Sequence, residues 1–231
     1  YDELDPSSLK TLPGDYYSHI KDGMNERKIA LAVGNFIDEA DAEVLEAIRK
    51  AAKVLEAQGV IIVEVNVDFL KEAAVANAIM TQTDGAAFHR ERMKEHPDWF
   101  GTDVRQRLET GAAFTSTEYS LARRTQTEVK RRCEILFDEY DALILPTTPI
   151  SAPVLEGENA VERARQLTRF TSPFNLTGLP ALSVPCGFTT EGLPIGLQIV
   201  SRAWNEAGVL RAGYAFQEAT EWHKAKPGIA L

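Results

Sequence analysis

The side chains in this sequence that most readily act as nucleophiles or metal ligands are two cysteines and four histidines. A reactive cysteine needs a base, commonly a histidine, to form its thiolate, and nothing marks a histidine as the partner of Cys186. Cys186 ends an apolar run that is typical of a strand, where a small thiol packs well in a core. We therefore predict a structural role for Cys186.

His89 and His96 are seven residues apart, so on a helix they would share one face, with Glu91 and Glu95 close by. Helical zinc sites normally place two ligands four residues apart, as in H-E-x-x-H, and that motif is absent. Pro97 indicates an exposed helix end instead. We therefore predict no metal site at these histidines.

Motifs for nucleotide binding and for a serine nucleophile are also missing from the sequence. It contains neither G-x-G-x-x-G nor G-x-x-x-x-G-K-[ST], which cradle phosphates, and no G-x-S-x-G nucleophile elbow. The residues taken by themselves therefore predict a fold with a polar loop, without a bound cofactor and without a catalytic centre.

Composition and charge limit the classes of partner. The net charge of −9 argues against nucleic-acid binding, because neutralising phosphates requires a basic surface. The basic residues at 123–124 and 130–132 alternate with glutamates on one predicted helix, which is typical of a solvent-exposed, ion-paired face. No apolar run approaches the roughly 20 residues that span a bilayer. Two cysteines in 231 residues do not indicate a disulfide framework, so we predict a cytoplasmic protein.

The polar residues best placed for binding lie in a loop at 171–178, which contains Asn175 and Thr177. Such residues are common in turns because their side chains bond to the nearby backbone. From spacing alone, therefore, this loop has two interpretations, turn chemistry or contact with a ligand.

The loop leads into a predicted β-hairpin. The tripeptide Gly-Leu-Pro precedes each strand, and it suits a sharp turn into a strand because glycine adopts positive φ and proline favours extended geometry before it. We expect strands at 181–184 and 195–200, joined by a turn at 188–192.

The first third of the chain predicts a strand–helix–strand unit. Apolar runs at 27–33 and 60–67 suit buried strands. Between them, apolar residues recur at helical spacing over 38–58, with Asp38 as a candidate N-cap and Gly59 as a stop. A unit of this length favours a right-handed crossover between parallel strands.

The remaining chain predicts mainly helices around this unit. We expect a helix at 68–96 that breaks near Gly85 and at Pro97, helices at 102–111, 116–140 (capped by Ser116), 161–168 and 206–220, and a strand at 141–146. With an extended arm at 1–25, these elements predict a single α/β domain over 1–231, a mixed β-sheet flanked by helices.

Three stretches together resemble the carboxy-terminal half of an amidase signature family enzyme. They are Y-D-E-L-D-P-S-S at 1–8, F-D-E-Y-D-A-L-I-L-P-T-T-P at 137–149, and residues 175–198, which contain both Gly-Leu-Pro tripeptides, P-C-G-F and P-I-G-L-Q. The third stretch is the most specific, and the similarity runs over nearly the whole chain. The resemblance implies the fold of that family, which agrees with the mixed sheet predicted above.

The resemblance also implies hydrolysis of a small-molecule amide to an acid and ammonia or an amine, with no metal or organic cofactor. Members use a serine nucleophile, a second serine in a cis peptide, a lysine base, and backbone amides as the oxyanion hole. In the family these groups belong to a Gly/Ser-rich run and an upstream lysine, which should precede residue 1. Ser7 and Ser8 lack the flanking glycines, and no lysine here matches.

Substrate-pocket residues are implied on two loops. In the family, the loop after the 141–146 strand and the loop before the hairpin border the substrate, which points to Thr148, Phe170, Thr171, Phe174 and Asn175. The two phenylalanines suit either an apolar acyl pocket or the core.

Arg107, in R-Q-R-L-E-T-G, resembles an arginine that the glutamyl-tRNA amidotransferase A subunit uses for a substrate carboxylate. The same protein has an aspartate where this chain has Thr168. A structural ion pair is therefore the other interpretation of Arg107.

We therefore expect the carboxy-terminal part of an amidase, which supplies pocket loops to a site completed by a missing amino-terminal segment. By itself such a chain would be inactive, and it would self-associate as a homo-oligomer through surfaces that the segment normally covers. The alternatives are a non-catalytic binding domain of the same fold and a protein similar to the amidotransferase A subunit. We expect neither nucleic-acid nor membrane partners.

Overall fold

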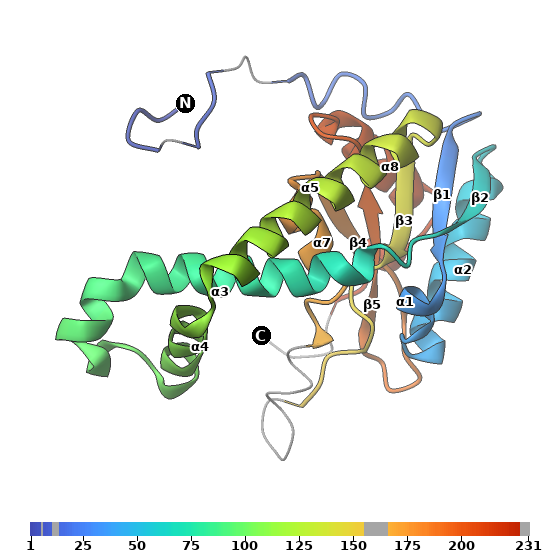
Figure 1. Ribbon diagram of the computed structural model, residues 1–231. Helices are drawn as coiled ribbons and strands as arrows, with labels where there is room; N and C mark the ends of the chain where they lie inside the picture. The colour runs from blue at the N-terminus through green and yellow to red at the C-terminus, as the bar shows by residue number, and fades with distance from the viewer. Residues whose placement is uncertain (6, 11–13, 155–165, 227–231) are drawn as a thin grey trace.

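The computed structural model of the protein describes residues 1–5, 7–10, 14–154 and 166–226 (Figure 1). Five strands form one sheet in the order β2-β1-β3-β5-β4. Strand β1 is parallel to β2 and β3, whereas β5 is antiparallel to β3 and β4. The mixed sheet predicted from the sequence is therefore confirmed. The strand bounds are Lys28–Val33 (β1), Ile61–Asn66 (β2), Ala142–Pro146 (β3), Ala181–Phe188 (β4) and Pro194–Val200 (β5).

Strands β1 and β2 are joined by helix α2, Ala42–Glu56, so the predicted parallel strand–helix–strand unit is confirmed. The predicted start of this helix at Asp38 is wrong. Residues Asn35–Asp38 form a separate one-turn helix, α1, and α2 follows Asp41. A contact with a distant loop accounts for the separation. The Asp41 N–H donates to the Pro149 carbonyl at 2.8 Å, which fixes the link between the two helices to the loop after β3.

Three long helices follow β2. They are α3 (Leu70–Glu95), α4 (Thr102–Ala113) and α5 (Ser116–Glu139), with a 3₁₀ turn, η1 (Pro97–Trp99), between α3 and α4. The predicted end at Pro97 is confirmed, but the predicted break near Gly85 is wrong. Helix α3 continues through Gly85 because α4 and α5 pack along it. A glycine inside a helix costs only about 1 kcal/mol relative to alanine, which such packing can offset.

The N-cap of α5 is Thr115 and not Ser116 as predicted. The Glu118 N–H donates to Thr115 Oγ1 at 3.2 Å, and the Thr115 N–H donates to Glu118 Oε2 at 2.7 Å. This reciprocal capping box satisfies two backbone donors, which explains why Thr115 rather than its neighbour ends the non-helical segment.

A short helix, α7 (Ser172–Thr177), occupies the stretch that we predicted as a loop. Six residues are too few to form a helix by propensity alone, so α7 depends on packing, and it lies against α3 and α5. It ends at Gly178, whose φ of 71° permits the turn into β4. The predicted hairpin is confirmed by the β4–β5 pair.

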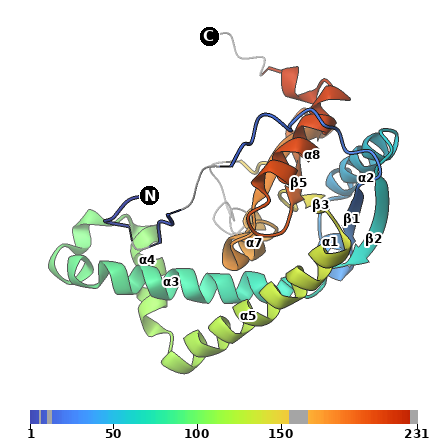
Figure 2. The same cartoon turned by 90° about the horizontal axis from the view of Figure 1, so that it is seen from above.

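Helix α8 (Glu206–Glu218) and the 3₁₀ turn η2 (Trp222–Lys224) close the described chain. The predicted helix at 161–168 falls mostly outside the described residues. Helices α2 and α8 cover one face of the sheet, and α3, α5 and α7 lie on the other side (Figures 1 and 2). Before β1, the described residues contain only turns and coil, attached to α8 where Arg211 Nε donates to the His19 carbonyl.

Two glycines on facing helices test the packing of α3 against α4. A Cβ at Gly111 would lie 2.0 Å from the Gln82 backbone oxygen, whereas a Cβ at Gly85 would meet only Leu108 Cδ2, at 3.5 Å. We expect Gly111→Ala to reduce the free energy of unfolding by about 1–3 kcal/mol through overpacking. Gly85→Ala should be neutral or stabilising by up to about 1 kcal/mol. Urea denaturation of both variants would check this, and equal effects would contradict the close helix contact.

Candidate functional site

The carboxyl ends of β1 and β3 meet at a point where the strand order reverses. Strand β2 lies on one side of β1 and β3 lies on the other, and the helices after β1 and β2 pass on opposite sides of the sheet. In open α/β sheets this arrangement separates the two connecting loops and leaves a crevice, which is where ligands usually bind. The loops after β1 and β3, together with α7, therefore form the candidate site.

The loop after β1 is held by Asp68, which follows β2. The Asp68 carboxylate accepts the Phe36 N–H at 2.8 Å and the side-chain amides of Asn66 and Asn35 at 3.1 and 3.3 Å. The Phe36 N–H contributes most to holding the pKa of Asp68 below its usual range. Gly34, with φ 115°, permits the close approach, since a Cβ there would lie 2.7 Å from the carboxylate.

The loop after β3 contains Thr147 and the predicted pocket residue Thr148. Thr148 is half-buried, and its hydroxyl donates to the Ile150 carbonyl at 2.8 Å within the same loop. Thr147 Oγ1 and Ser183 Oγ lie 2.7 Å apart, which joins the loop to β4. These bonds fix the conformation of the loop at the carboxyl end of β3.

Helix α7 and the residues before it bring together four of the predicted pocket residues. Phe170 and Phe174 are buried in the core, and the Phe170 ring meets Phe36 edge to face at a centroid distance of 5.1 Å. Of their two interpretations, the structure places both rings in the core. Thr171 is half-buried and its hydroxyl donates to the Thr168 carbonyl at 3.2 Å, while Asn175 is exposed.

Two glutamines hold this helix in place. Gln198 is 3% exposed on β5, and its Nε2 donates to the Phe170 carbonyl at 2.9 Å. From α5, Gln126 Nε2 donates to the Leu176 carbonyl at 2.7 Å. The Leu176 carbonyl is one of the last four of α7, which a helix cannot satisfy internally, whereas the Phe170 carbonyl lies just before the helix, so the two bonds hold the segment at both ends. Sequence reasoning did not identify either glutamine, although Gln198 is conspicuous as the one polar residue in an apolar strand.

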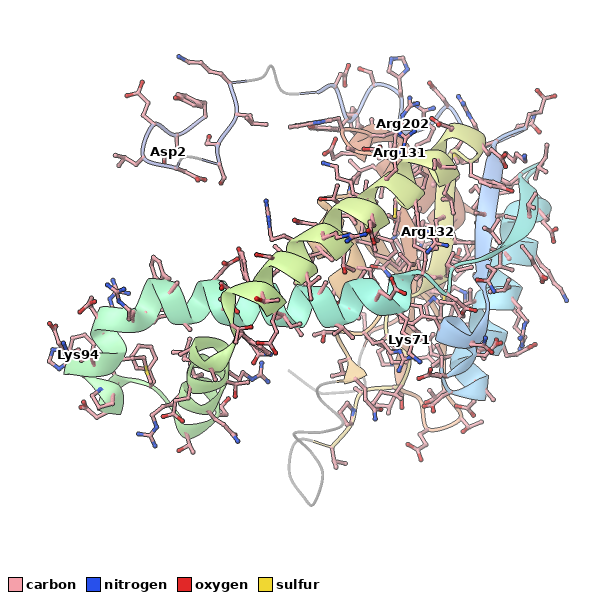
Figure 3. The ribbon with its side chains drawn as sticks, in the orientation of Figure 1. Asp2, Lys71, Lys94, Arg131, Arg132 and Arg202 are labelled. Carbon is pink, nitrogen blue, oxygen red and sulfur yellow. The ribbon has the colours of Figure 1, made fainter. Side chains whose placement is uncertain are left out.

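Arg169, which sequence reasoning also missed, lies immediately before Phe170. Its Nη1 pairs with Glu39, and its guanidinium carbon lies 5.0 Å from the centroid of the Phe36 ring. The hydrogen bond from Arg169 is the main reason that the pKa of Glu39 lies below its usual range. Lys71 also approaches Glu39, at 3.8 Å, from the end of α3 nearest the sheet; Figure 3 shows it there and Lys94 at the far end.

Arg107 is not part of this cluster. It is exposed on α4, which packs on α3 away from α7 (Figures 1 and 2), and no ion pair involves it within the described ranges. The structure therefore does not unite Arg107 with Thr148 or with the residues of α7.

The two cysteine thiols are buried, and the hydroxyl of Ser7 is hydrogen-bonded. Burial raises the pKa of both Cys133 and Cys186 to about 12, so both thiols are protonated at neutral pH, as a structural role requires. The Ser7 hydroxyl donates to the Asp5 carboxylate at 2.6 Å in an exposed turn. Among the described residues, no group of three or more His, Cys, Asp or Glu side chains could hold a metal ion.

Within residues 1–5, 7–10, 14–154 and 166–226, no helix combines the length and the apolar composition needed to cross a bilayer.

The sequence and the fold of this chain both match known proteins. The sequence profile of the family described as Amidase matches residues 1–210. An amidase of Pseudomonas putida is 34% identical over 99% of this chain and 50% of its own length. The glutamyl-tRNA(Gln) amidotransferase A subunit of Thermodesulfovibrio yellowstonii is 32% identical over 98% of this chain and 52% of its own length.

A solved structure confirms the fold. This structure belongs to a vestigial protein complex that reveals the evolutionary origins of an s-triazine catabolic enzyme. It superposes on 94% of this chain with a TM-score of 0.84, and the two sequences are 27% identical. The match covers 48% of that protein. The present chain thus spans about half the length of the relatives it matches.

The buried Gln198 amide provides a test of how α7 is positioned. Gln198→Leu would leave the Phe170 carbonyl without its donor, so we expect a loss of about 1–3 kcal/mol in the free energy of unfolding. The Gly178 amide, which bonds to Phe174 at the end of α7, should exchange faster with solvent. The matched control is Gln58→Leu, because the Gln58 amide, just beyond the end of α2, donates to the Val54 carbonyl at 3.4 Å and its loss should matter little. Equal effects of the two substitutions would contradict this role of Gln198.

The ion pair at Arg169 provides a second test. Arg169→Met keeps an apolar contact over Phe36 but removes the charge, so we expect the pKa of Glu39 to rise towards its usual range, measured by carboxyl NMR titration. Because the pair lowers this pKa, its stabilisation is present above the usual pKa of a glutamate and is lost as the pH falls through the lowered value. Glu118, whose low pKa depends on Thr115, is the internal control and should not change. An unchanged Glu39 titration would contradict the pairing.

Proposed function

Because this chain belongs to the amidase family, we propose that it is the carboxy-terminal part of an enzyme that hydrolyses a carbon–nitrogen amide bond in a small molecule. The products would be an acid and ammonia or an amine. The observation that carries the proposal is the sequence match to amidases, which covers nearly all of this chain but only half the length of the matched amidase.

In this proposal the catalytic serine, the second serine and the lysine base belong to a segment outside this sequence. The serine would attack the amide carbonyl while the lysine accepts its proton, and backbone N–H groups would stabilise the oxyanion. Collapse of the oxyanion would break the C–N bond and expel the amine or ammonia, which takes the proton back from the lysine, and water would then release the acid from the acyl-enzyme. The protonated thiols of Cys133 and Cys186 support this division, because neither can replace the serine at neutral pH.

The described chain would supply one wall of the substrate pocket. Thr148, Thr171 and Asn175 would present polar groups, while Phe170 and Phe174 would form the apolar layer beneath them. Rigid support favours this role, since a binding group held by packing and buried hydrogen bonds keeps its geometry when substrate arrives. The Gln198 and Gln126 bonds give α7 that support. The enzyme would act in the cytoplasm without a metal or organic cofactor.

The alternative is a role like that of the amidotransferase A subunit, one of which is 32% identical to this chain. In that interpretation Arg107 would hold a substrate carboxylate. The position of Arg107 on α4, apart from α7, favours the hydrolase instead. A small neutral amide is therefore the substrate class that we propose.

Activity should depend on the segment outside this sequence. We expect residues 1–231 alone to release no ammonia from propionamide, benzamide or glutamine, and the polypeptide extended by its upstream coding sequence to release ammonia from at least one of them. Turnover by the short chain would contradict the proposal. A folded, extended polypeptide that is inactive on amides would support the non-catalytic binding domain instead. Preference for glutamine over both other amides would support the amidotransferase-like role.

A further inference from the structure

A cavity of about 310 Å³ lies between α2, the carboxyl end of β4, helix α8 and the 3₁₀ turn η2. It is on the face of the sheet that α2 and α8 cover, opposite α7 (Figures 1 and 2). Sites that bind small molecules have volumes of roughly 300–1,000 Å³, so this cavity is at the lower end of that range. It therefore has room for one aromatic ring with a short side chain.

Small residues on α2 and β4 leave this space open. Ala47 and Ala51 are buried on α2, and they line the cavity together with Gly187 on β4. A Cβ at Gly187 would lie 3.5 Å from the Ala47 Cβ, so the helix and the strand are in ordinary contact beside the open space. The buried Cys186 thiol also lines the space and is uncharged at neutral pH. The inner part of the cavity is therefore apolar.

Three aromatic side chains also line the cavity. Phe216 of α8 is buried, whereas Phe188 and Trp222 are 43% and 40% exposed. The rings of Phe188 and Trp222 meet edge to face at a centroid distance of 5.9 Å. Because this contact already restrains both rings, they can bind an apolar group with little further loss of conformational entropy.

The charged residues at the cavity leave one carboxylate without a cationic partner. Glu46 pairs with Lys50 at 3.6 Å, whereas Glu43 has no ion pair within the described ranges. Glu43 Oε2 accepts the Thr190 N–H at 3.2 Å, which holds the carboxylate beside the hairpin turn. A carboxylate can accept several hydrogen bonds, so Glu43 retains the capacity to bind a donor on a ligand.

A second hollow meets the first at Glu43 and Thr190. Asp41 and Glu191 also line this hollow, and none of its lining residues in the described chain is cationic. The apolar cavity therefore opens, on the side of Glu43, onto a surface whose charge complements a cation. An anionic ligand would be repelled there.

We propose that this cavity binds a small organic cation, an aromatic ring that carries a primary ammonium group on a short aliphatic chain. The ring would enter the apolar cavity beside Phe188 and Trp222, and the ammonium group would donate hydrogen bonds to Glu43. The ring supplies the apolar area that drives binding, and the ammonium group selects for charge. Binding at this cavity does not depend on the proposed hydrolysis of amides.

Calorimetric titration with phenethylamine tests the ligand class, because this amine is protonated at neutral pH. We expect it to bind both residues 1–231 and the extended polypeptide. Neutral phenethyl alcohol and anionic hydrocinnamate should bind at least about 10-fold more weakly, as the loss of a charge-assisted hydrogen bond implies. The affinity for the amine should also fall with added salt, since Glu43 is exposed. Equal affinities for the amine and the alcohol would overturn the proposal.

Two charge-matched substitutions on α2 test the role of Glu43. Glu43→Gln keeps the shape of the side chain but removes its charge, so phenethylamine should bind about 5–10-fold more weakly. Glu56→Gln makes the same change of net charge on the same helix but outside the cavity, and it should leave the affinity unchanged. Both residues are exposed, so neither substitution should unfold the chain. Equal weakening by the two substitutions would overturn the proposal.

Amide NMR tests where the ligand binds. Saturating phenethylamine should shift the resonances of Cys186 and Gly187, which line the cavity, and should leave the Gly178 amide at the end of α7 unchanged. Phe188→Ala should weaken binding at least about 3-fold, because it removes an exposed ring from the cavity. Shifts confined to α7 would overturn the proposal.

The rest of the polypeptide and a second copy of this chain are the competing occupants of the cavity. Binding of phenethylamine to residues 1–231 but not to the folded, extended polypeptide would assign the cavity to the rest of the polypeptide. An affinity that falls as the protein concentration rises would assign it to a second copy. Either result would overturn the proposal, whether or not the extended polypeptide hydrolyses amides.

Discussion

The hydrogen bond from Gln198 to the Phe170 carbonyl is the interaction on which the candidate site depends. It lies in the core, where an unpaired carbonyl would be costly, and it joins the hairpin to a helix too short to be stable by itself. The bond requires Gln198 to face α7, and side chains alternate along a strand. A shift of one residue in the β3–β5 register would turn this amide to the other face and leave α7 without its anchor.

Hydrogen bonds and an ion pair also connect loops from distant parts of the chain around the candidate site. Asp68 fixes the turn after β1, and the Asp41–Pro149 hydrogen bond joins the segment after that turn to the loop after β3. Arg169, just before α7, pairs with Glu39 in the same segment. All of these contacts gather where the strand order reverses. Polar side chains here therefore serve mainly to hold loops in place.

Much of the fold could be predicted from local patterns, and the errors have identifiable causes. The strands, the parallel crossover and the hairpin followed from apolar runs and from Gly-Leu-Pro. Helix α7 could not be predicted, because its stability comes from packing on α3 and from two glutamines distant in sequence. For the same reason α3 passes through Gly85. In the candidate site, the resemblance pointed to Thr148 and to residues within and just before α7, whereas the Arg169–Glu39 pair joins residues 130 positions apart and has no local signal.

The two buried thiols have a practical consequence. Cys133 lies on α5 and Cys186 on β4, so one is buried in the helical layer and the other in the outer strand of the sheet. Since both are shielded and protonated in the folded chain, an alkylating reagent can modify either one only when its surroundings open. The two cysteines are therefore internal reporters, and their rates of alkylation would measure how often the helical layer and the outer strand unfold locally.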